Sequence, residues 1–353
     1  MSEYAYERHI AELAVLRASI LTKGVQSGVS EISKEDNSPV TIADFAAQCL
    51  IIKALYHAFP NDMFLGEEDS ATLRVDEKLR DKVYDLVLAA EDVINLQDSG
   101  KPLPKPESVE EMLDLIDLGG HKTGCKAGGR FWTIDPIDGT AAFLKGQQYA
   151  VSLALIEDGR EVIGIIGCPN ISAEMTRITE NEVDKTGLGI MLTAVRGQGS
   201  AIRSMTPTGL GDPSPLETLR PLSSKQLHII DCATAVTCRH DVIAKLADRF
   251  ETTFPNTEIW SSHIRYAALI VGGGDVHFLI PADPATKMPI WDHAGSQLVF
   301  TELGGKVTDL DGNEIDFCAG RDLSRNRGLV VARGGIHGRI LATMKTILVE
   351  ESR

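Results

Sequence analysis

Apolar side chains in residues 1–222 alternate between helical spacing and short continuous runs. Helical spacing predicts three helices, over residues 4–26, 40–59 and 74–96. Apolar runs predict five strands, over residues 63–65, 131–134, 149–157, 161–168 and 190–195. Asp158-Gly159 stands between the third and fourth of these strands and predicts a hairpin. Polar residues at 31–39 and prolines and a glycine at 98–108 predict loops.

Residues 223–353 alternate more regularly between strands and helices. Strands are expected over 227–230, 276–280 and 328–332, and helices over 241–250, 262–271, 292–303 and 336–349. This alternation indicates an α/β architecture. Four prolines between residues 205 and 221 indicate a boundary. We therefore expect an N-terminal α+β domain over 1–222 and a C-terminal α/β domain over 223–353.

The charge of the chain narrows the choice of partner. It has 35 basic and 50 acidic side chains, which give a net charge of −15 at pH 7. A surface this acidic repels long nucleic acids and anionic membranes, so we expect neither as a partner. A small phosphorylated metabolite would need a local positive centre, and bound cations are the obvious source of one.

We expect no targeting segment in this chain. Its first residues lack a basic region followed by an apolar run, and Glu3, Glu7 and Glu12 are not typical of organelle-targeting peptides. No stretch approaches the roughly 18 apolar residues of a membrane span. The six cysteines form no C-x-x-C pair, so we interpret them as reduced thiols and expect a cytoplasmic protein.

Three groups of carboxylates lie at the ends of predicted apolar elements. Glu67-Glu68-Asp69 follows the strand 63–65, Asp135 and Asp138 follow the strand 131–134, and Asp292 begins the expected helix 292–303. Burying such groups is costly unless another charge compensates for them. Oxygen-only ligands of this kind suit hard cations such as Mg²⁺, whereas Zn²⁺ would call for His or Cys.

A tight turn is expected directly after the strand 131–134. Pro136 and Gly139 would direct Asp135, Asp138 and a backbone carbonyl between them toward one point, and a threonine hydroxyl follows at once.

Each carboxylate group also has a purely structural interpretation. Glu67-Glu68-Asp69 could be a solvated acidic turn, Asp-x-x-Asp-Gly is a common turn sequence, and Asp292 could cap a helix. Spacing alone does not show that the three groups converge.

Three segments resemble the signatures of the inositol monophosphatase superfamily of lithium-sensitive, metal-dependent phosphatases. They are Gly66-Glu67-Glu68, residues 132–140 (WTIDPIDGT) and residues 291–295 (WDHAG), in the order of that family. Within the superfamily, the chain most resembles the fungal and plant 3′(2′),5′-bisphosphate nucleotidases, which convert 3′-phosphoadenosine 5′-phosphate to AMP. Residues 129–132, 148–156, 165–170 and 194–197 support this closer resemblance.

The resemblance implies an α/β fold, a layered α-β-α-β-α sandwich of the inositol monophosphatase and fructose-1,6-bisphosphatase type, with two or three Mg²⁺ ions between its halves. Carried over by motif, Glu67, Asp135 and the carbonyl of Ile137 would hold one Mg²⁺. Asp135, Asp138 and Asp292 would hold a second.

The resemblance also implies roles around the metal ligands. Asp44 and Thr140 would orient and deprotonate the attacking water. The residues expected to contact the substrate are Thr140, His240, Ser262, Arg265 and Asp292.

The chain departs from the family pattern beside this set. The basic residue that usually follows the Asp-Gly-Thr turn is replaced by Ala141-Ala142. The lysine of the nucleotide-binding helix is Arg265, and an arginine expected within 276–281 is replaced by Leu279. Two interpretations stay open, namely tolerated drift in a working nucleotidase and a substrate pocket that has been retuned.

We therefore predict a Mg²⁺-dependent phosphomonoesterase that removes the 3′-phosphate of 3′-phosphoadenosine 5′-phosphate by metal-activated water, acting as a monomer or homodimer. One alternative is a paralogue with a retuned pocket that acts on another phosphate or diphosphate metabolite, such as an inositol phosphate. An alternative of another class is a non-catalytic protein that binds metal or nucleotide. The complete set of expected ligands argues against this last interpretation.

Overall fold

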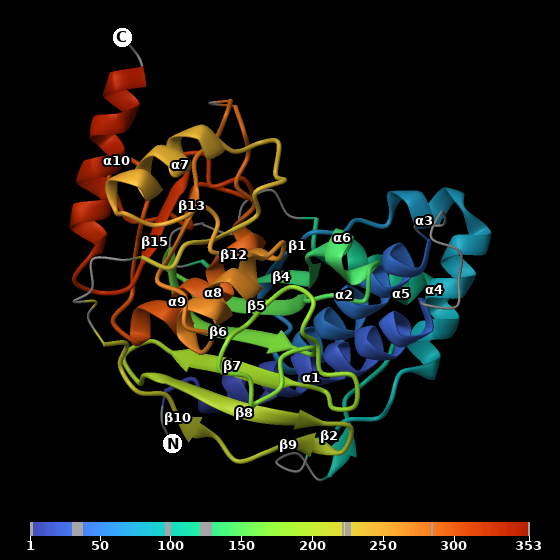
Figure 1. Ribbon diagram of the computed structural model, residues 1–353. Coiled ribbons are helices and arrows are strands. Elements are labelled where there is room, and N and C mark those ends of the chain that lie inside the picture. Colours follow the sequence, from blue (N-terminus) through green and yellow to red (C-terminus); the bar gives the residue numbers. More distant parts are fainter. Residues whose placement is uncertain are drawn as a thin grey trace.

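The computed structural model describes residues 3–29, 38–95, 100–120, 129–220, 222, 227–283 and 285–351. Its helices and strands form alternating layers in the order α-β-α-β-α (Figure 1). The α/β sandwich expected from the sequence is therefore confirmed. Most of the predicted loop 31–39 lies outside the described residues, and Ser38 already begins a helix.

A large sheet forms the centre of the N-terminal part. Its strand order is β1-β4-β5-β6-β7-β8-β10, with β9 paired to β8. The pair β1–β4 is parallel and the other neighbours are antiparallel. The bounds are β1 (Met63–Gly66), β4 (Arg130–Asp138), β5 (Ala150–Glu157), β6 (Arg160–Cys168), β7 (Ile190–Val195), β8 (Ser200–Thr206), β9 (Gly209–Leu210) and β10 (Ser214–Pro215).

Helices cover both faces of this sheet. The first layer consists of α1 (Ala5–Val29) and α2 (Ser38–Ala58). Trp132 and Ile134 of β4 belong to the apolar cluster on this side, whereas Phe131 joins the cluster on the opposite side. Successive strand residues point to opposite faces, so burial of both faces explains the continuous apolar runs in the sequence.

The C-terminal part supplies the remaining three layers. Helices α8 (Ser262–Ile270) and α9 (Ala294–Glu302) lie between the large sheet and an antiparallel sheet with the order β13-β15-β14. That sheet consists of β13 (Val276–Leu279), β15 (Leu329–Ala332) and β14 (Lys306–Thr308). Helices α7 (His240–Arg249) and α10 (His337–Glu351) form the outer layer over an apolar cluster on its far face.

Shorter elements differ most from the sequence prediction. They are α3 (Ala71–Val75), α4 (Glu77–Ala89), β2 (Ile94–Asn95), β3 (Lys101–Pro102), α5 (Val109–Leu118), α6 (Thr140–Phe143), β11 (Ile230–Asp231), β12 (Thr257–Glu258) and the 3₁₀ turn η1 (Ile290–Asp292). The helix predicted over 74–96 was wrong beyond Ala89, because residues 94–95 pair with 101–102. The helix predicted to begin at Asp292 begins two residues later, at Ala294.

Two further sequence predictions concern the whole chain. The division between 222 and 223 stays a prediction, since residues 221 and 223–226 lie outside the described part. Cys49, Cys168, Cys232 and Cys238 are free, but Cys318 is disulfide-bonded, so the prediction of reduced thiols was wrong there. Within the described ranges, no helix is both long and apolar enough to cross a membrane.

Strand β6 and helix α9 approach each other through glycine. A Cβ atom on Gly164 would lie 2.3 Å from the carbonyl oxygen of Gly295 and 3.1 Å from Cβ of Leu298. A side chain at this position would therefore push α9 away from the large sheet.

We predict that Gly164→Ala lowers the free energy of unfolding by about 1–3 kcal/mol, the usual cost of overpacking a core. Gly28→Ala is the matched control, because a Cβ on Gly28 of α1 meets nothing within 4 Å. That change should stabilise the protein by up to about 1 kcal/mol. Urea unfolding measures both, and equal stability of the two variants would contradict the packing argument.

Candidate metal centre

The end of β4 places two carboxylates inside the protein. Asp135 is 2% exposed and Asp138 is 8% exposed. Residues three apart on a regular strand point to opposite faces. The register between β4 and β5 shifts between Asp135 and Asp138, and this irregularity allows both side chains to reach one point. The tight turn predicted from Pro136 and Gly139 was wrong at Pro136, which lies within β4, and was right at Gly139.

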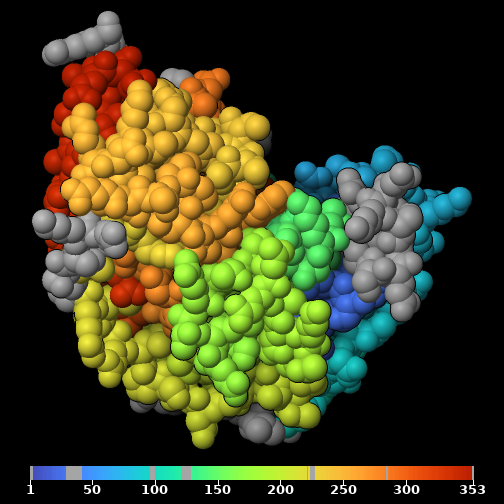
Figure 2. Space-filling model, viewed as in Figure 1, coloured from blue at the N-terminus to red at the C-terminus, as the bar shows by residue number. Residues whose placement is uncertain are grey.

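The chain turns instead at Gly139. Its φ is 94°, a conformation that favours glycine, and a Cβ there would lie 2.9 Å from Cβ of Ser261. Thr140 then begins α6, and its Oγ1 donates a hydrogen bond of 3.4 Å to the carbonyl oxygen of Ile137. Figure 2 shows α6, in green, in a hollow between the orange and the blue parts of the chain.

A third carboxylate comes from the C-terminal part. One ligand atom each of Asp135, Asp138 and Asp292 lies within 4.8 Å of the other two. Asp292 belongs to η1, and the buried ring of His263 holds this turn from α8. Nε2 of His263 donates to the carbonyl oxygen of Trp291 at 2.7 Å, and Nδ1 lies 2.8 Å from Oγ of Ser296.

The N-terminus of α8 binds the second of these carboxylates. Oδ2 of Asp138 accepts hydrogen bonds from Oγ of Ser261 and, at 2.7 Å, from the backbone N–H of His263. Oγ of Ser261 also accepts from the N–H of Ile264 at 3.1 Å and so caps the helix. The positive end of the helix dipole favours a carboxylate here. Sequence reasoning missed Ser261 and His263, although both adjoin the predicted Ser262.

Asp44 and Glu67 border the three aspartates. Glu67 directly follows β1, which runs parallel to β4, so the ends of both strands meet. Gln48 of α2 fixes the turn after β1, since Nε2 donates to the carbonyl oxygen of Glu68 at 2.8 Å and Oε1 accepts from its N–H at 3.0 Å. Asp44 lies one helical turn before Gln48 and is 5% exposed.

The electrostatics of this cluster favour a cation. Burial, followed by the charges of neighbouring carboxylates, raises the pKa of Asp44, Asp135 and Asp292 well above its ordinary value. Burial and the charge of Asp138 raise the pKa of Glu67 to about 7. Oδ1 of Asp44 and Oδ1 of Asp135 are buried without a hydrogen-bond partner. This donor set therefore fits a hard cation such as Mg²⁺.

Arg265 and His240, two of the residues predicted to contact a substrate, have different surroundings. Arg265 donates to Oγ of Ser262 at 3.0 Å and lies 3.6 Å from Asp231, and its charge counteracts the raised pKa of Asp292. His240 is held by its own region of the chain. Nε2 of its ring donates to a carbonyl oxygen at position 235, and the ring stacks on Phe254 at 5.8 Å.

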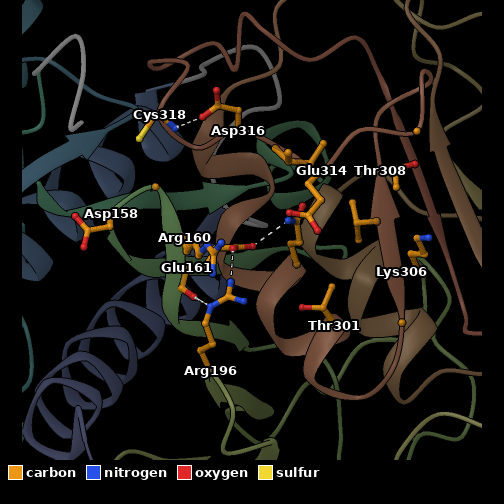
Figure 3. Close-up of a pocket in the computed structure, with 16 residues that line it drawn as sticks. Asp158, Arg160, Glu161, Arg196, Thr301, Lys306, Thr308, Glu314, Asp316 and Cys318 are labelled. Atoms are coloured by element: carbon orange, nitrogen blue, oxygen red, sulfur yellow. Dashed lines mark hydrogen bonds and ion pairs between the residues drawn. The ribbon is translucent and has the colours of Figure 1, made fainter. Parts of the chain in front are cut away.

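A cavity of about 710 Å³ lies elsewhere (Figure 3). Glu161 and Arg196 line it and are joined by an ion pair of 2.7 Å. Glu161 pairs with Ile156 of β5, which in turn pairs with Phe131 of β4. Phe131 and Asp135 are roughly 13 Å apart along the strand, at about 3.3 Å per residue. This cavity is therefore separate from the carboxylate cluster.

The fold and the carboxylate cluster agree with sequence comparison. A sequence model of the inositol monophosphatase family matches residues 4–348, and the chain belongs to that family. Solved structures with the same fold include inositol monophosphatase II of Staphylococcus aureus, with a TM-score of 0.59, 17% identity and coverage of 96% of this chain and 95% of that one. SuhB of Mycobacterium tuberculosis has a TM-score of 0.58, 18% identity and 98% coverage of both chains.

Relatives that are more similar in sequence share one name. That name is 3′(2′),5′-bisphosphate nucleotidase. The protein of this name from Emericella nidulans is 39% identical to this chain, over 98% of this chain and 99% of the relative. The corresponding protein of Schizosaccharomyces pombe is 36% identical, over 95% and 94%. That of Oryza sativa is 30% identical, over 99% and 96%.

We predict that Asp135→Asn abolishes Mg²⁺ binding and stabilises the metal-free protein. The amide removes a buried negative charge that burial and its neighbours disfavour. Calorimetric titration with Mg²⁺ and urea unfolding in EDTA measure the two effects.

Asp114→Asn is the control, because Asp114 is an exposed partner of Arg74 and such ion pairs contribute little. This variant should bind Mg²⁺ like the wild type. An Asp135→Asn variant that retains wild-type Mg²⁺ affinity, or is less stable without metal, would contradict the charge argument.

Proposed function

We propose that this protein is a Mg²⁺-dependent phosphomonoesterase that hydrolyses the 3′-phosphate of 3′-phosphoadenosine 5′-phosphate, giving AMP and inorganic phosphate. The observation that carries the proposal is the convergence of Asp135, Asp138 and Asp292 within 4.8 Å. The name shared by relatives that match almost the whole chain supports the choice of substrate.

The proposed metal ligands fall into two sets. Glu67, Asp135 and the carbonyl oxygen of Ile137 would hold one Mg²⁺, and Asp135, Asp138 and Asp292 would hold a second. Bound Mg²⁺ would supply the positive charge that lowers the pKa of a water molecule and offsets the charge of the phosphate. The acidic chain, with a net charge of −15, needs such a local positive centre to bind an anionic substrate.

The chain itself would orient the water and take up its proton. Oδ1 of Asp44 is buried and has no hydrogen-bond partner, so it can accept a proton from a water molecule beside the cluster. The hydroxyl of Thr140, at the start of α6, would fix the orientation of that water. Attack by water on phosphorus, with departure of the ribose 3′-oxygen, requires no covalent enzyme intermediate.

The proposed substrate contacts are Thr140, His240, Ser262, Arg265 and Asp292. Among them, Arg265 has the most direct structural support, because its charge lies near Asp292 and it donates a hydrogen bond to Ser262. A guanidinium can bind phosphate with two parallel hydrogen bonds. His240 stays in the proposed set because the residue is only partly buried, at the start of α7, and Nδ1 of its ring has no hydrogen-bond partner among the described residues.

A second candidate function is hydrolysis of another phosphate or diphosphate metabolite. The turn after Thr140 carries Ala141-Ala142 where the resembling nucleotidases have a basic residue. Lys145 is the basic residue that this turn does offer, and its Nζ lies over the ring of Trp260 at 3.8 Å from the centroid. That cation–π contact directs the lysine toward Trp260, which favours a pocket retuned for a different leaving group.

Three further features belong to the proposal. We propose two domains, 1–222 and 223–353, that together bind a small phosphorylated metabolite and neither nucleic acid polymers nor membranes. We also propose a cytoplasmic location, and a monomer or homodimer as the active form.

Phosphate release from a small panel of substrates tests the proposed function. With Mg²⁺, 3′-phosphoadenosine 5′-phosphate should yield AMP and phosphate, whereas inositol 1-phosphate should yield far less. EDTA should abolish the release and Li⁺ should inhibit it. Asp135→Asn should lower kcat/KM at least about 100-fold, since a metal supplies several kcal/mol of transition-state stabilisation.

The other outcomes separate the alternatives. Release from inositol 1-phosphate or a diphosphate metabolite, but not from the nucleotide, would favour the retuned pocket. Mg²⁺ or nucleotide binding without release from any substrate would indicate a non-catalytic protein. Release that persists in Asp135→Asn would show that Asp135 does not hold an essential metal.

A further inference from the structure

One arginine contacts the residues that immediately precede two of the carboxylates. Arg321 lies between β14 and β15 and is partly buried. One guanidinium nitrogen donates to the carbonyl oxygen of Gly66 at 2.8 Å, and Gly66 precedes Glu67. The guanidinium carbon also lies over the ring of Trp291, 4.6 Å from its centroid, and Trp291 precedes Asp292.

The same residue makes further contacts across the described part of the fold. Its other terminal nitrogen donates to the carbonyl oxygen of Gly119, after α5, at 2.9 Å. The carbonyl oxygen of Arg321 accepts from the N–H of Ile290, the first residue of η1, at 2.8 Å. The end of β1, the end of α5 and the turn η1 are therefore joined through one residue.

The charge of Arg321 also acts on the cluster. It lowers the pKa of Glu67, which burial raises. Burial lowers the pKa of Arg321 itself, and the charges of Asp322, Asp69 and Glu67 raise it. The guanidinium is thus a fixed positive charge beside carboxylates that repel one another.

We propose that Arg321 is a positioning residue for the metal centre, and that it holds Glu67 and Asp292 at the spacing at which they would bind the two neighbouring Mg²⁺ ions that share Asp135. This role rests on the proposed function, because it presumes that the cluster binds Mg²⁺. Arg321 acts through Gly66 and Trp291 and does not itself contact the reacting atoms.

The shape of the side chain is essential to this role. A planar guanidinium can donate to two carbonyl oxygens while one face stacks on an aromatic ring. Lysine keeps the positive charge, but its ammonium group cannot reproduce this planar fork. Arg321→Lys therefore separates the contribution of charge from that of geometry, and Arg321→Met removes both.

Arg333 provides a matched control. Its side chain is also largely buried, with 17% exposure, and donates to two carbonyl oxygens, of Gly274 at 2.8 Å and of Leu269 at 2.9 Å. These contacts lie at the C-terminal end of α8, whereas Asp138 is bound at the N-terminal end. Arg333→Met thus removes a comparable set of bonds, together with a 3.7 Å ion pair to Asp275, at a distance from the candidate metal ligands.

The experiment measures Mg²⁺ binding to each purified variant by calorimetry without substrate, the Mg²⁺ dependence of phosphate release, and thermal unfolding in EDTA. Arg321→Met should raise the Kd for Mg²⁺ roughly 10- to 100-fold, the usual effect of losing a group that orients metal ligands. The kcat of Arg321→Met at saturating Mg²⁺ should fall by a much smaller factor than the factor by which its Kd for Mg²⁺ rises. Arg321→Lys should recover only part of the affinity, and Arg333→Met should bind Mg²⁺ like the wild type.

Two results would overturn the positioning role. One is an Arg321→Met variant with unchanged Mg²⁺ affinity, and the other is an equal loss of affinity in Arg333→Met, which would point to general destabilisation. If Arg321→Met does not fold, Arg321→Lys decides, and wild-type affinity in that variant would overturn the geometric argument. A wild-type protein that binds Mg²⁺ but hydrolyses no nucleotide would refute the proposed function and leave the Mg²⁺ titrations valid.

Discussion

The mutual repulsion of buried carboxylates is the constraint on which this structure depends. Burial raises the pKa of Asp44, Asp135 and Asp292, and each charge makes its neighbours more costly to ionise. A fold optimised only for stability would separate these side chains or replace them. Here the surrounding elements hold them together, and a bound cation would recover the stability that is lost to repulsion.

The layered fold explains how the carboxylates stay close together despite their mutual repulsion. The cluster draws on both halves of the chain, because β1 and β4 end beside α2 on one side, and η1 and the N-terminus of α8 approach from the other. Asp138 is anchored by the capped end of α8, and His263 holds the turn that carries Asp292. The close packing of Gly164 against Gly295 keeps α9, and with it η1, against the large sheet. Site geometry and core packing are therefore not independent.

The sequence predicted the parts of this arrangement that depend on local chemistry. The strands β5 and β6 follow from long apolar runs, and Asp158-Gly159 turns them into a hairpin because both residues adopt positive φ. The expected carboxylates could be identified by motif. The irregularity in β4, the short strand β14 and the roles of Ser261, His263 and Arg321 could not be predicted. They arise from contacts between segments that are far apart in sequence, and no periodicity within one segment encodes such contacts.

The expected metal ligands could be identified from the sequence more readily than the expected substrate contacts. A ligand set for a hard cation must supply oxygen atoms at one point, so only a few residue types can occupy Asp135, Asp138 or Asp292. A substrate pocket, in contrast, can place a positive charge beside the phosphate from residues at several different positions. Arg265 already lies 3.6 Å from Asp231, and a substrate phosphate would compete with that carboxylate for the guanidinium. If Arg265 contacts the substrate as proposed, the affinity for a phosphorylated substrate would depend on how far binding displaces that ion pair, and the motif residues do not specify this.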